Sequence, residues 1–270
     1  MSLTVAVAQF APGEDKSANL RTIEEQVTTA AERGARLVVL PEFAVFTASS
    51  MGTSFVDSAE PLDGPAVSRL AALSASLDVT IVAGINESAD GARIHNALVG
   101  LQGGELRAVY RKVHLYDAFG YRESDRVIAA DPQEPVLLDV DGFKVGLQTC
   151  YDVRFPESSR ALVDAGADVL AIPAAWMPGP LKEYHWGTLL RARAIENTVY
   201  VVAADQTGRS GVGHSVILDP MGTALAALGE VPGVGVAPLE RARLDQVRET
   251  NPALSLRRYR VAPGAPSPAR

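Results

Sequence analysis

Cys150 is the strongest candidate nucleophile because it is the single cysteine of the chain and stands where a strand is expected to end. It directly follows the apolar run 143–149, and Pro156 is placed to begin a helix soon afterwards. Ligands gather at the C-terminal ends of strands in open α/β sheets. We therefore expect an exposed thiol whose thiolate is favoured by nearby backbone N–H groups. The alternative is a buried structural cysteine that acts as a small hydrophobic residue.

Two charged residues occupy positions that could support such a nucleophile. Glu42 follows the apolar run LVVL (37–40) and Pro41, and a carboxylate held against an apolar wall could serve as a general base. Lys112 lies in VYRKVHLYD (109–117), and beside a carboxylate its ammonium could stabilise an oxyanion. Glu123 follows further along the chain. Taken singly, each of these is more often a solvated surface charge.

Four histidines offer a different partner for the thiol, namely His95, His114, His185 and His214. A papain-like pairing of cysteine and histidine is therefore a possible arrangement. The sequence alone pairs none of the four with Cys150. A protease of this kind, using His114 or His185, stays open as an alternative.

The elements that must position these residues alternate between short apolar strands and helical patterns. Buried strands are predicted at residues 3–10, 37–40, 79–85, 169–173 and 200–204, and hairpins around 103–104, 141–142 and 220–222. Continuous apolar strands indicate sheets covered on both faces, and hairpins among βα units indicate mixed sheets. Ten or more strands usually split into two packed sheets. We expect helices outside two sheets, a charged helix near 239–248, and a loose tail after it.

The composition excludes several classes of protein. The chain has 270 residues, 47% of them hydrophobic, and a formal net charge of −7 without a basic run, so binding to nucleic acid or an anionic membrane is not expected. One cysteine excludes an intramolecular disulfide and a multi-cysteine zinc site. Because no apolar run approaches about 18 residues and no basic segment precedes the first apolar residues, we expect a cytoplasmic protein.

The charged and thiol blocks together resemble the nitrilase superfamily, the carbon–nitrogen hydrolases. The resemblance rests on LVVLPEF around Glu42, YRKVHLYD around Lys112 and GLQTCYDVRFPE around Cys150. It continues through ADVLAIPAAW (167–176), HWGTLLRARAIENTVYVVAADQTG (185–208) and GHSVILDPMG (213–222). The three blocks stand in the family's order, and the resemblance covers the chain from Leu3 to about Tyr259.

The resemblance implies an α/β fold, a four-layer α-β-β-α sandwich with two mixed β-sheets packed face to face and helices outside. It implies a carbon–nitrogen hydrolase domain over residues 1–260 and a C-terminal tail over 261–270. It also implies Glu42 as general base, Lys112 as electrostatic stabiliser and Cys150 as nucleophile, with Glu123 positioning these three. The backbone N–H of Tyr151 would share the oxyanion with Lys112. No metal or organic cofactor is implied.

The residues that follow Cys150 narrow the expected class of substrate, again by resemblance. CYDVRFPE and HWGTLLRARAIE are similar to the branch that contains ω-amidases and deaminated-glutathione amidases. That branch implies hydrolysis of a small carboxylic ω-amide through a thioester acyl-enzyme, with release of ammonia. The alternatives are an N-carbamoyl compound or aliphatic amide hydrolase of the same superfamily, and a catalytically silent binding module on the same fold.

An anionic substrate needs a cation beside the nucleophile, and Arg154 or Arg122 could bind its carboxylate bidentately. The other interpretation of Arg154 is an ion pair with Asp152 or Glu157. Trp176 is expected to line the pocket, the alternative being a core tryptophan. By analogy with the family, the helix HWGTLLRARAIE and the segment 239–259 are candidates for the interface of a homodimer or higher homo-oligomer.

Overall fold

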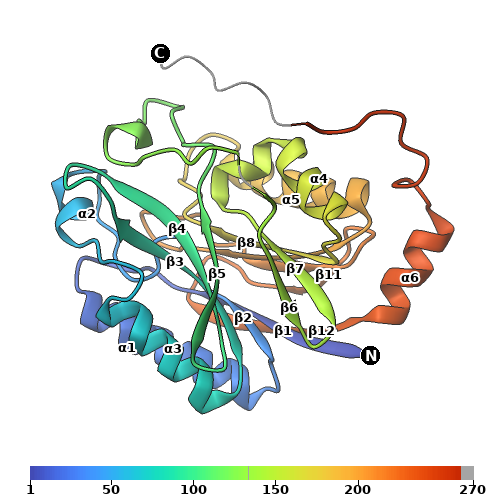
Figure 1. Cartoon of the computed structure of the whole chain (residues 1–270), viewed down its shortest axis with the longest axis horizontal. Coiled ribbons are helices and arrows are strands. Elements are labelled where there is room, and N and C mark those ends of the chain that lie inside the picture. The colour runs from blue at the N-terminus through green and yellow to red at the C-terminus, as the bar shows by residue number, and fades with distance from the viewer. Residues whose placement is uncertain (133, 263–270) are drawn as a thin grey trace.

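Two six-stranded mixed sheets form the centre of the protein in the computed structural model, which describes residues 1–132 and 134–262 (Figure 1). The first sheet contains, in spatial order, β12 (Gly233–Glu240), β1 (Ser2–Gln9), β2 (Leu37–Val39), β3 (Thr80–Ser88), β4 (Ile94–Gln102) and β5 (Glu105–Arg111). The second contains β6 (Leu137–Val140), β7 (Phe143–Leu147), β8 (Val169–Ala174), β9 (Tyr200–Asp205), β10 (Val216–Leu218) and β11 (Ala224–Ala227).

Helices cover the outer face of each sheet and complete a four-layer α-β-β-α sandwich (Figure 1). The first sheet is covered by α1 (Lys16–Glu32) and α3 (Pro65–Leu77), and the second by α4 (Pro156–Asp164) and α5 (Lys182–Asn197). The remaining helical segments are α2 (Thr53–Asp57), α6 (Arg241–Thr250) and two short 3-10 helices, η1 (Glu123–Asp125) and η2 (Cys150–Arg154). The predicted fold class is therefore confirmed.

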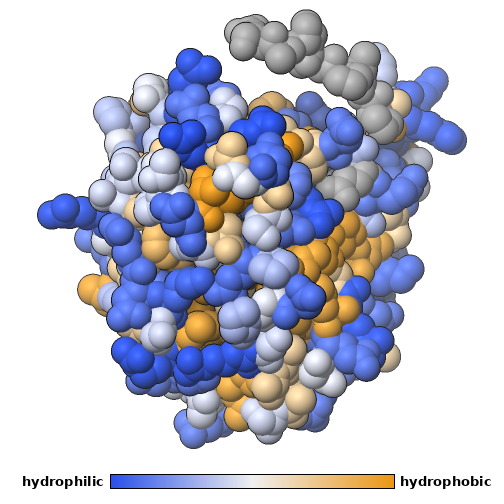
Figure 2. All heavy atoms as spheres, turned by 60° about the vertical axis from the view of Figure 1, so that its left-hand side comes forward, coloured by the Kyte–Doolittle hydropathy of each residue, from blue (hydrophilic) through white to orange (hydrophobic). Residues whose placement is uncertain are grey.

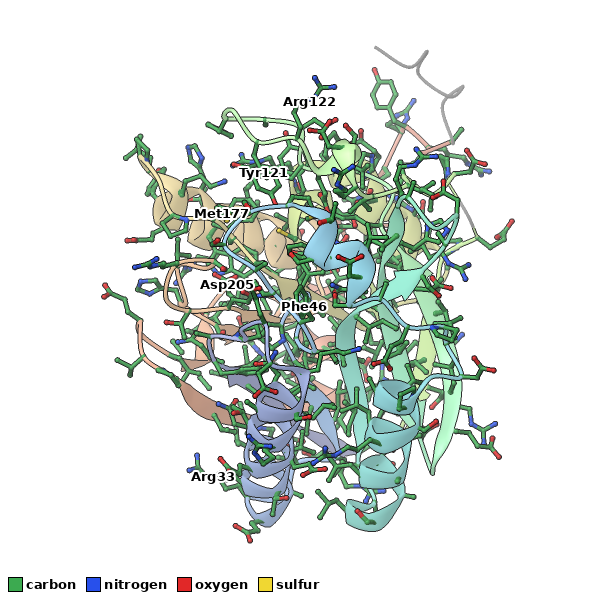
Figure 3. All side chains as sticks on the ribbon, turned by 90° about the vertical axis from the view of Figure 1, so that its left-hand side faces the viewer. Arg33, Phe46, Tyr121, Arg122, Met177 and Asp205 are labelled. Carbon is green, nitrogen blue, oxygen red and sulfur yellow. The ribbon has the colours of Figure 1, made fainter. Side chains whose placement is uncertain are left out.

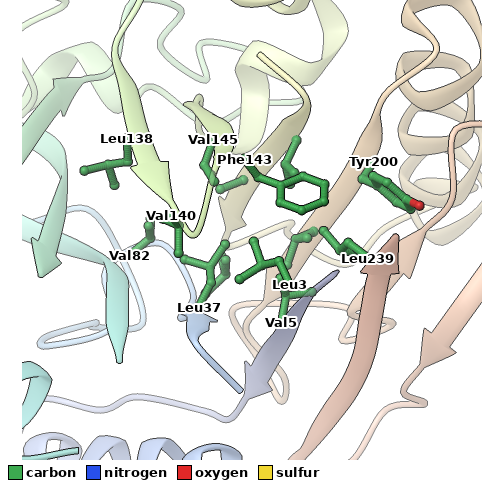
Figure 4. Packing of buried hydrophobic residues seen from close by; sticks show 14 of the residues in the cluster. Leu3, Val5, Leu37, Val82, Leu138, Val140, Phe143, Val145, Tyr200 and Leu239 are labelled. Carbon is green, nitrogen blue, oxygen red and sulfur yellow. The ribbon is translucent and has the colours of Figure 1, made fainter. Parts of the chain in front are cut away.

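The core between the sheets forms because alternate residues of each strand point to opposite faces. Leu3 and Val5 of β1 meet Val140 and Phe143 of the second sheet in one central cluster, part of which Figure 4 shows. Ala6 of β1, which lies between Val5 and Val7, is instead in the cluster under α1 and α3. Both faces of the central strands are thus buried, which explains their uninterrupted apolar sequences.

The hairpins lie where the turn residues predict them. Gly103 and Gly104 both have positive φ, 60° and 86°, and so do Asp141 and Gly142, with 47° and 79°. Two left-handed residues in succession make the type I′ turn, whose twist matches that of the flanking strands. These turns fix the registers of β4 with β5 and of β6 with β7.

The sequence interpretation missed one strand, β12. Leu239 was expected to start a helix but lies in β12, and the helix α6 begins two residues later, at Arg241. The segment GVGVAPLE contains two glycines and a proline, which are poor strand formers. Its extended conformation is stabilised by antiparallel pairing with β1 at the edge of the sheet. Of the predicted tail 261–270, residues 263–270 lie outside the described residues.

The face of the molecule drawn in Figure 2 mixes hydrophilic and hydrophobic residues, and polar residues interrupt its apolar areas. No helix in the part of the chain that the structure describes is both long and apolar enough to cross a bilayer.

Candidate active site

Cys150, Glu42 and Lys112 each follow the C-terminal end of a strand, respectively β7, β2 and β5. Figure 3 shows this end of the sheets, with Asp205 and Tyr121 near it, while Arg33 at the end of α1 lies at the opposite end. Residues from three strands and both sheets are thus brought to one place, as the general rule for strand ends in α/β proteins predicts.

A buried ammonium lies between two buried carboxylates. Lys112 Nζ donates hydrogen bonds to Glu42 Oε1 at 2.8 Å and to Glu123 Oε2 at 2.9 Å, and all three side chains are 2% exposed. Asn96 of β4 joins the same two carboxylates, because its Nδ2 donates to Glu42 Oε1 at 2.7 Å and to Glu123 Oε1 at 2.8 Å. Each buried charge therefore has an opposite charge and a hydrogen-bond partner, without which its burial would be costly.

The charges of this cluster set its protonation state. Burial by itself would lower the pKa of Lys112, but the carboxylates of Glu123 and Glu42 outweigh burial and raise that pKa well above its ordinary value. Burial raises the pKa of Glu123, and the neighbouring charge of Glu42 adds to this effect. Lys112 is therefore a permanent ammonium at neutral pH, suited to stabilise negative charge rather than to exchange protons.

Backbone N–H groups hold both carboxylates in place. Ala175, which follows β8, donates from its backbone nitrogen to Glu42 Oε2 at 2.7 Å, and Tyr116 donates in the same way to Glu123 Oε2 at 2.7 Å. Gln206 Nε2 donates to the backbone oxygen of Glu42 at 2.7 Å. The Glu42 carboxylate is thus fixed from the first sheet by Lys112 and from the second by a backbone amide.

Cys150 is buried, with 6% of its surface exposed, which corrects the expectation of an exposed thiol. Burial and then the charge of Glu42 raise the pKa of the Cys150 thiol well above its ordinary value, and the opposing effect of Lys112 is smaller. The expected bias toward the thiolate is therefore wrong for the resting protein: Cys150 is a protonated thiol beside a carboxylate.

The turn that carries Cys150 is sharp and well anchored. Cys150 has φ 46°, a left-handed conformation that costs about 1–2 kcal/mol for a residue with a side chain, and it opens η2. Asp152 Oδ2 accepts the backbone N–H of Thr149 at 3.1 Å and the hydroxyl of Tyr110 at 2.6 Å. These hydrogen bonds explain how the surrounding structure sustains an unfavourable backbone conformation at this position.

The predicted substrate residues Tyr151, Arg154 and Trp176 lie together. The Arg154 guanidinium carbon is 4.8 Å from the centroid of the Trp176 ring and 5.8 Å from that of Tyr151. Trp176 is buried, and its backbone nitrogen donates to Asp205 Oδ1 at 2.7 Å. Trp176 therefore contacts Arg154 as well as the core, where its ring packs against that of Trp186.

The structure distinguishes Arg154 from Arg122, the two arginines that the sequence offers as carboxylate-binding residues. Arg154 has no ion pair with Asp152 or Glu157 among residues 1–132 and 134–262. Arg122, by contrast, is 69% exposed at its side chain, lies 3.5 Å from Asp125, and projects away from the body in Figure 3. Arg154 is thus the arginine beside the cysteine turn.

His114 and His185, the two histidines considered for a papain-like protease, contact partners other than the thiol. His114 Nδ1 lies 2.8 Å from Asp152 Oδ1, and His185 Nδ1 lies 3.4 Å from a guanidinium nitrogen of Arg154. Glu42, and no histidine, is the charged side chain that raises the pKa of the thiol, so a papain-like pairing finds no support. In the described part of the chain, no group of three or more potential metal ligands could hold a metal ion.

Sequence reasoning missed four residues that shape this site: Asn96, Tyr116, Ala175 and Lys182. Asn96 left a signal, since it is a polar residue directly before the apolar run 97–101 of strand β4. Tyr116 and Ala175 act through backbone amides, which no side-chain pattern reveals. Lys182 stands in a loop-to-helix junction without a recognisable pattern around it.

The two-sheet sandwich thus carries a buried glutamate, lysine and cysteine after strands β2, β5 and β7. Residues 4–249 match the carbon–nitrogen hydrolase family. The chain belongs to this family, and hence to the nitrilase superfamily, and it is an amidase-type enzyme acting on C–N bonds.

Three known proteins illustrate the relationship. A deaminated glutathione amidase of Escherichia coli O157:H7 is 42% identical over 257 residues, covering 95% of this chain and 98% of its own. Nit3 of Saccharomyces cerevisiae, a member of branch 10 of the nitrilase superfamily, has TM-score 0.84 and 27% identity over 96% of this chain and 97% of its own. An amidase from Nesterenkonia sp. AN1, with an acetamide moiety covalently added at its active-site cysteine, has TM-score 0.80 and 28% identity, covering 94% of this chain and 96% of its own.

Proposed function

We propose that this protein hydrolyses the amide of a small carboxylic ω-amide through a thioester acyl-enzyme. The observation that carries the proposal is the burial of Cys150, Glu42 and Lys112 at one end of the two sheets, where Lys112 Nζ lies 2.8 Å from Glu42 Oε1 and the charges of both residues act on the Cys150 thiol. A carboxylate beside a protonated thiol is the arrangement that a general base and a nucleophile require.

In the first half of the reaction, Glu42 takes the proton of the Cys150 thiol while the sulfur attacks the amide carbonyl carbon. The oxyanion that forms is held by the Lys112 ammonium and the backbone N–H of Tyr151. The ammonium carries three protons and binds two carboxylates, so one proton serves the oxyanion. Protonated Glu42 then gives its proton to the leaving nitrogen, and the amine or ammonia departs.

In the second half, Glu42 removes a proton from water, and the hydroxide attacks the thioester carbonyl. The carbon–sulfur bond breaks, the thiol recovers its proton from Glu42, and the acid product leaves. Glu123 acts as a positioning residue, because it contacts Lys112 at 2.9 Å and shares Asn96 with Glu42. It keeps the ammonium in place through both halves of the reaction.

The substrate class rests on Arg154 and on the relatives. Arg154 is a half-buried cation on the wall of Trp176 and Tyr151, suited to bind a carboxylate bidentately. The Escherichia coli relative is named a deaminated glutathione amidase. Deaminated glutathione and α-ketoglutaramate share the α-ketoglutaryl acyl group, whose free carboxylate would meet Arg154, and differ only in the leaving group.

A substrate panel tests the proposal. The purified protein is incubated with α-ketoglutaramate, α-ketosuccinamate, deaminated glutathione, butyramide and an N-carbamoyl amino acid, and both the acid product and the released nitrogen are measured. We expect the acids with an ω-amide to have the highest kcat/KM and Arg154→Lys to raise their KM. A preference for butyramide, or carbon dioxide release from the carbamoyl compound, would favour the alternative substrates.

Cys150→Ala is the control for covalent catalysis. Removal of a nucleophile of this kind lowers kcat by about 10⁴-fold or more, and the substitution of a neutral buried thiol by a methyl group should leave the melting temperature near that of the wild type. Full activity in Cys150→Ala would contradict the proposal. The protein would then be a catalytically silent module, and the activity would come from another enzyme in the preparation.

Two expectations about the whole molecule stay predictions. A homodimer or higher homo-oligomer through α5 and the segment 239–259 is proposed by analogy with the family, and the exposed apolar residues Ile195, Leu256 and Tyr259 lie in these segments. A cytoplasmic location is likewise proposed.

A further inference from the structure

Lys182, the first residue of α5, is a buried cation that the mechanism above does not use. Its surface is 4% exposed, and its Nζ donates a hydrogen bond to Tyr116 Oη at 3.2 Å. Among the residues that the structure describes, no carboxylate forms an ion pair with it. A buried lysine without an acidic partner is unusual, because buried charges are normally paired.

Aromatic rings surround the ammonium of Lys182. Its Nζ lies 4.7 Å from the ring centroid of Tyr116, 4.9 Å from that of Phe119 and 4.6 Å from that of Trp176. At these distances a cation is attracted to the faces of aromatic rings, which compensates in part for its lost hydration. The same rings also approach the other cation of this region.

Arg154 shares two of the three rings with Lys182. Its guanidinium carbon is 4.8 Å from the centroid of Trp176 and 5.8 Å from that of Phe119. The Nε atom of Arg154 is buried and has no hydrogen-bond partner. Two cations thus lie close to the rings of Trp176 and Phe119, and one of them keeps a buried donor that nothing in the described structure satisfies.

The charged groups around Lys182 do not neutralise the two positive charges of Lys182 and Arg154. Burial lowers the pKa of Lys182, and the positive charge of Arg154 lowers it further, while Cys150 and Asp205 act in the opposite direction. The Cys150 thiol is protonated at rest, as its raised pKa indicates. Burial also raises the pKa of Asp205 well above its ordinary value, so this carboxyl is neutral as well. A bound anion would compensate both cations at once.

We propose that Lys182 is a specificity-determining residue, which together with Arg154 binds the carboxylate of the ω-amide substrate. This inference rests on the proposed function, and it adds a second cation to the single arginine considered there. Arg154 would bind the carboxylate through its planar guanidinium, and Lys182 would contribute a point charge from the N-terminus of α5. A neutral amide gains nothing from either group and leaves two cations without an anion.

A matched pair of substrates isolates the carboxylate. Succinamate and butyramide have the same chain length and the same scissile amide, and differ in a carboxylate that replaces a methyl group. The specificity ratio, kcat/KM for succinamate divided by kcat/KM for butyramide, therefore reports what the enzyme gains from the charge. It is measured for the wild type, Lys182→Met, Lys182→Gln and Lys182→Arg.

We expect Lys182→Met to lower the specificity ratio by about 10- to 100-fold, the range for one hydrogen bond to a charged group, mainly through a higher KM for succinamate. Lys182→Gln keeps a donor for Tyr116 Oη without the charge, and we expect a similar fall. Lys182→Arg restores the charge and should retain most of the ratio. Lys144→Met, at an exposed position of β7, is the matched control and should leave the ratio unchanged.

A purely structural role for Lys182 predicts a different result. Lys182→Met and Lys182→Gln would then lower kcat/KM for both substrates by the same factor, and the ratio would stay at its wild-type value, which would overturn the inference. If Lys182→Met does not fold, the pair Lys182→Gln and Lys182→Arg decides. A wild-type enzyme that prefers butyramide would instead refute the proposed substrate class, so the two failures are distinguishable.

Discussion

The two sheets have the same topology but contribute different chemistry to the site. Taken from β12 to β5 and from β6 to β11, neighbouring strands are antiparallel, parallel, parallel, antiparallel and antiparallel in both. The first sheet supplies the charged side chains, Glu42 after β2 and Lys112 after β5, together with Asn96 within β4. The second supplies the Cys150 thiol after β7 and the backbone amide of Ala175 after β8.

A sharp turn at a strand end is the one feature that both halves of the site share. Phe43, directly after Glu42, has φ 52°, and Cys150 itself has φ 46°. Left-handed residues with a side chain are unfavourable and persist where the surrounding structure imposes them. The topology therefore builds two similar platforms, and the residue types at the strand ends decide that one holds charge and the other holds the nucleophile.

The largest combined effect on turnover and stability is expected from Lys112→Met in the first sheet. Loss of one oxyanion donor lowers kcat by about 10²–10³-fold, and here the same residue also orients the general base, so we expect the upper end of that range or more. The substitution also leaves Glu42 and Glu123 buried without a cation, which destabilises proteins by about 3–5 kcal/mol. Turnover and the free energy of unfolding are the measurements.

The loss of stability in Lys112→Met should depend on pH. Burial raises the pKa of Glu123 and the Lys112 charge opposes this effect, so without the ammonium the folded-state pKa of Glu123 rises further above the unfolded value of about 4.3. The folded state then retains a proton that the unfolded state releases. Stability then falls as the pH increases above that value, and the loss relative to wild type is larger at pH 8 than at pH 5. Equal losses of unfolding free energy at pH 5 and pH 8 would contradict this account. Cys150→Ala in the second sheet is the control, because it removes no charge from the site.

A smaller effect is expected from Gly84→Ala in β3 of the first sheet. A Cβ at this position would lie 2.5 Å from both Glu42 Cα and Phe43 N, which are backbone atoms and cannot rotate away. The strand end that carries Glu42 must shift, so we expect kcat to fall about 10- to 100-fold and stability by about 1–3 kcal/mol.

Gly146→Ala in β7 is the matched substitution in the second sheet. Its Cβ would meet Leu162 Cβ at 3.1 Å and Ala167 Cβ at 3.2 Å, on the helix-covered face away from Glu42. We expect it to lower the melting temperature with a smaller loss of kcat than Gly84→Ala. If Gly84→Ala affected kcat no more than Gly146→Ala, the close approach of β3 to the Glu42 turn would not matter for catalysis.

The smallest effect concerns Asp205 at the end of β9. It is fully buried, its Oδ1 accepts the backbone N–H of Trp176 at 2.7 Å, and its Oδ2 has no partner. Because burial raises its pKa well above the unfolded value of about 3.9, the folded state holds a proton and stability from this group falls with rising pH. Between the unfolded and the folded pKa of Asp205, the free energy of unfolding falls by about 1.4 kcal/mol per pH unit.

Asp205→Asn removes this proton while keeping an oxygen for Trp176. We therefore expect the variant to lose less stability than the wild type between pH 5 and pH 7 in urea unfolding experiments. Identical pH dependence in the two proteins would mean that Asp205 is ionised in the folded state.

Local sequence predicted most of the fold but not the edge strand β12. The strands β2, β3, β8 and β9 and the hairpins at 103–104 and 141–142 follow from apolar runs and glycine turns that act over a few residues. β12 could not be predicted in the same way, because its extended conformation depends on pairing with β1, more than two hundred residues earlier in the chain.

The sequence by itself determined which chemical groups stand at the strand ends: a carboxylate at Glu42, an ammonium at Lys112 and a thiol at Cys150. Only the tertiary structure decided that Lys112 lies between two carboxylates, that Cys150 is buried and protonated, and that Arg154 and Lys182 both lie near the Trp176 ring. The physical reason is that residue type and backbone conformation are local properties. Burial and charge pairing, which set the pKa of each group, arise from contacts between segments far apart in the chain, such as Glu42 and Lys112, 70 residues apart.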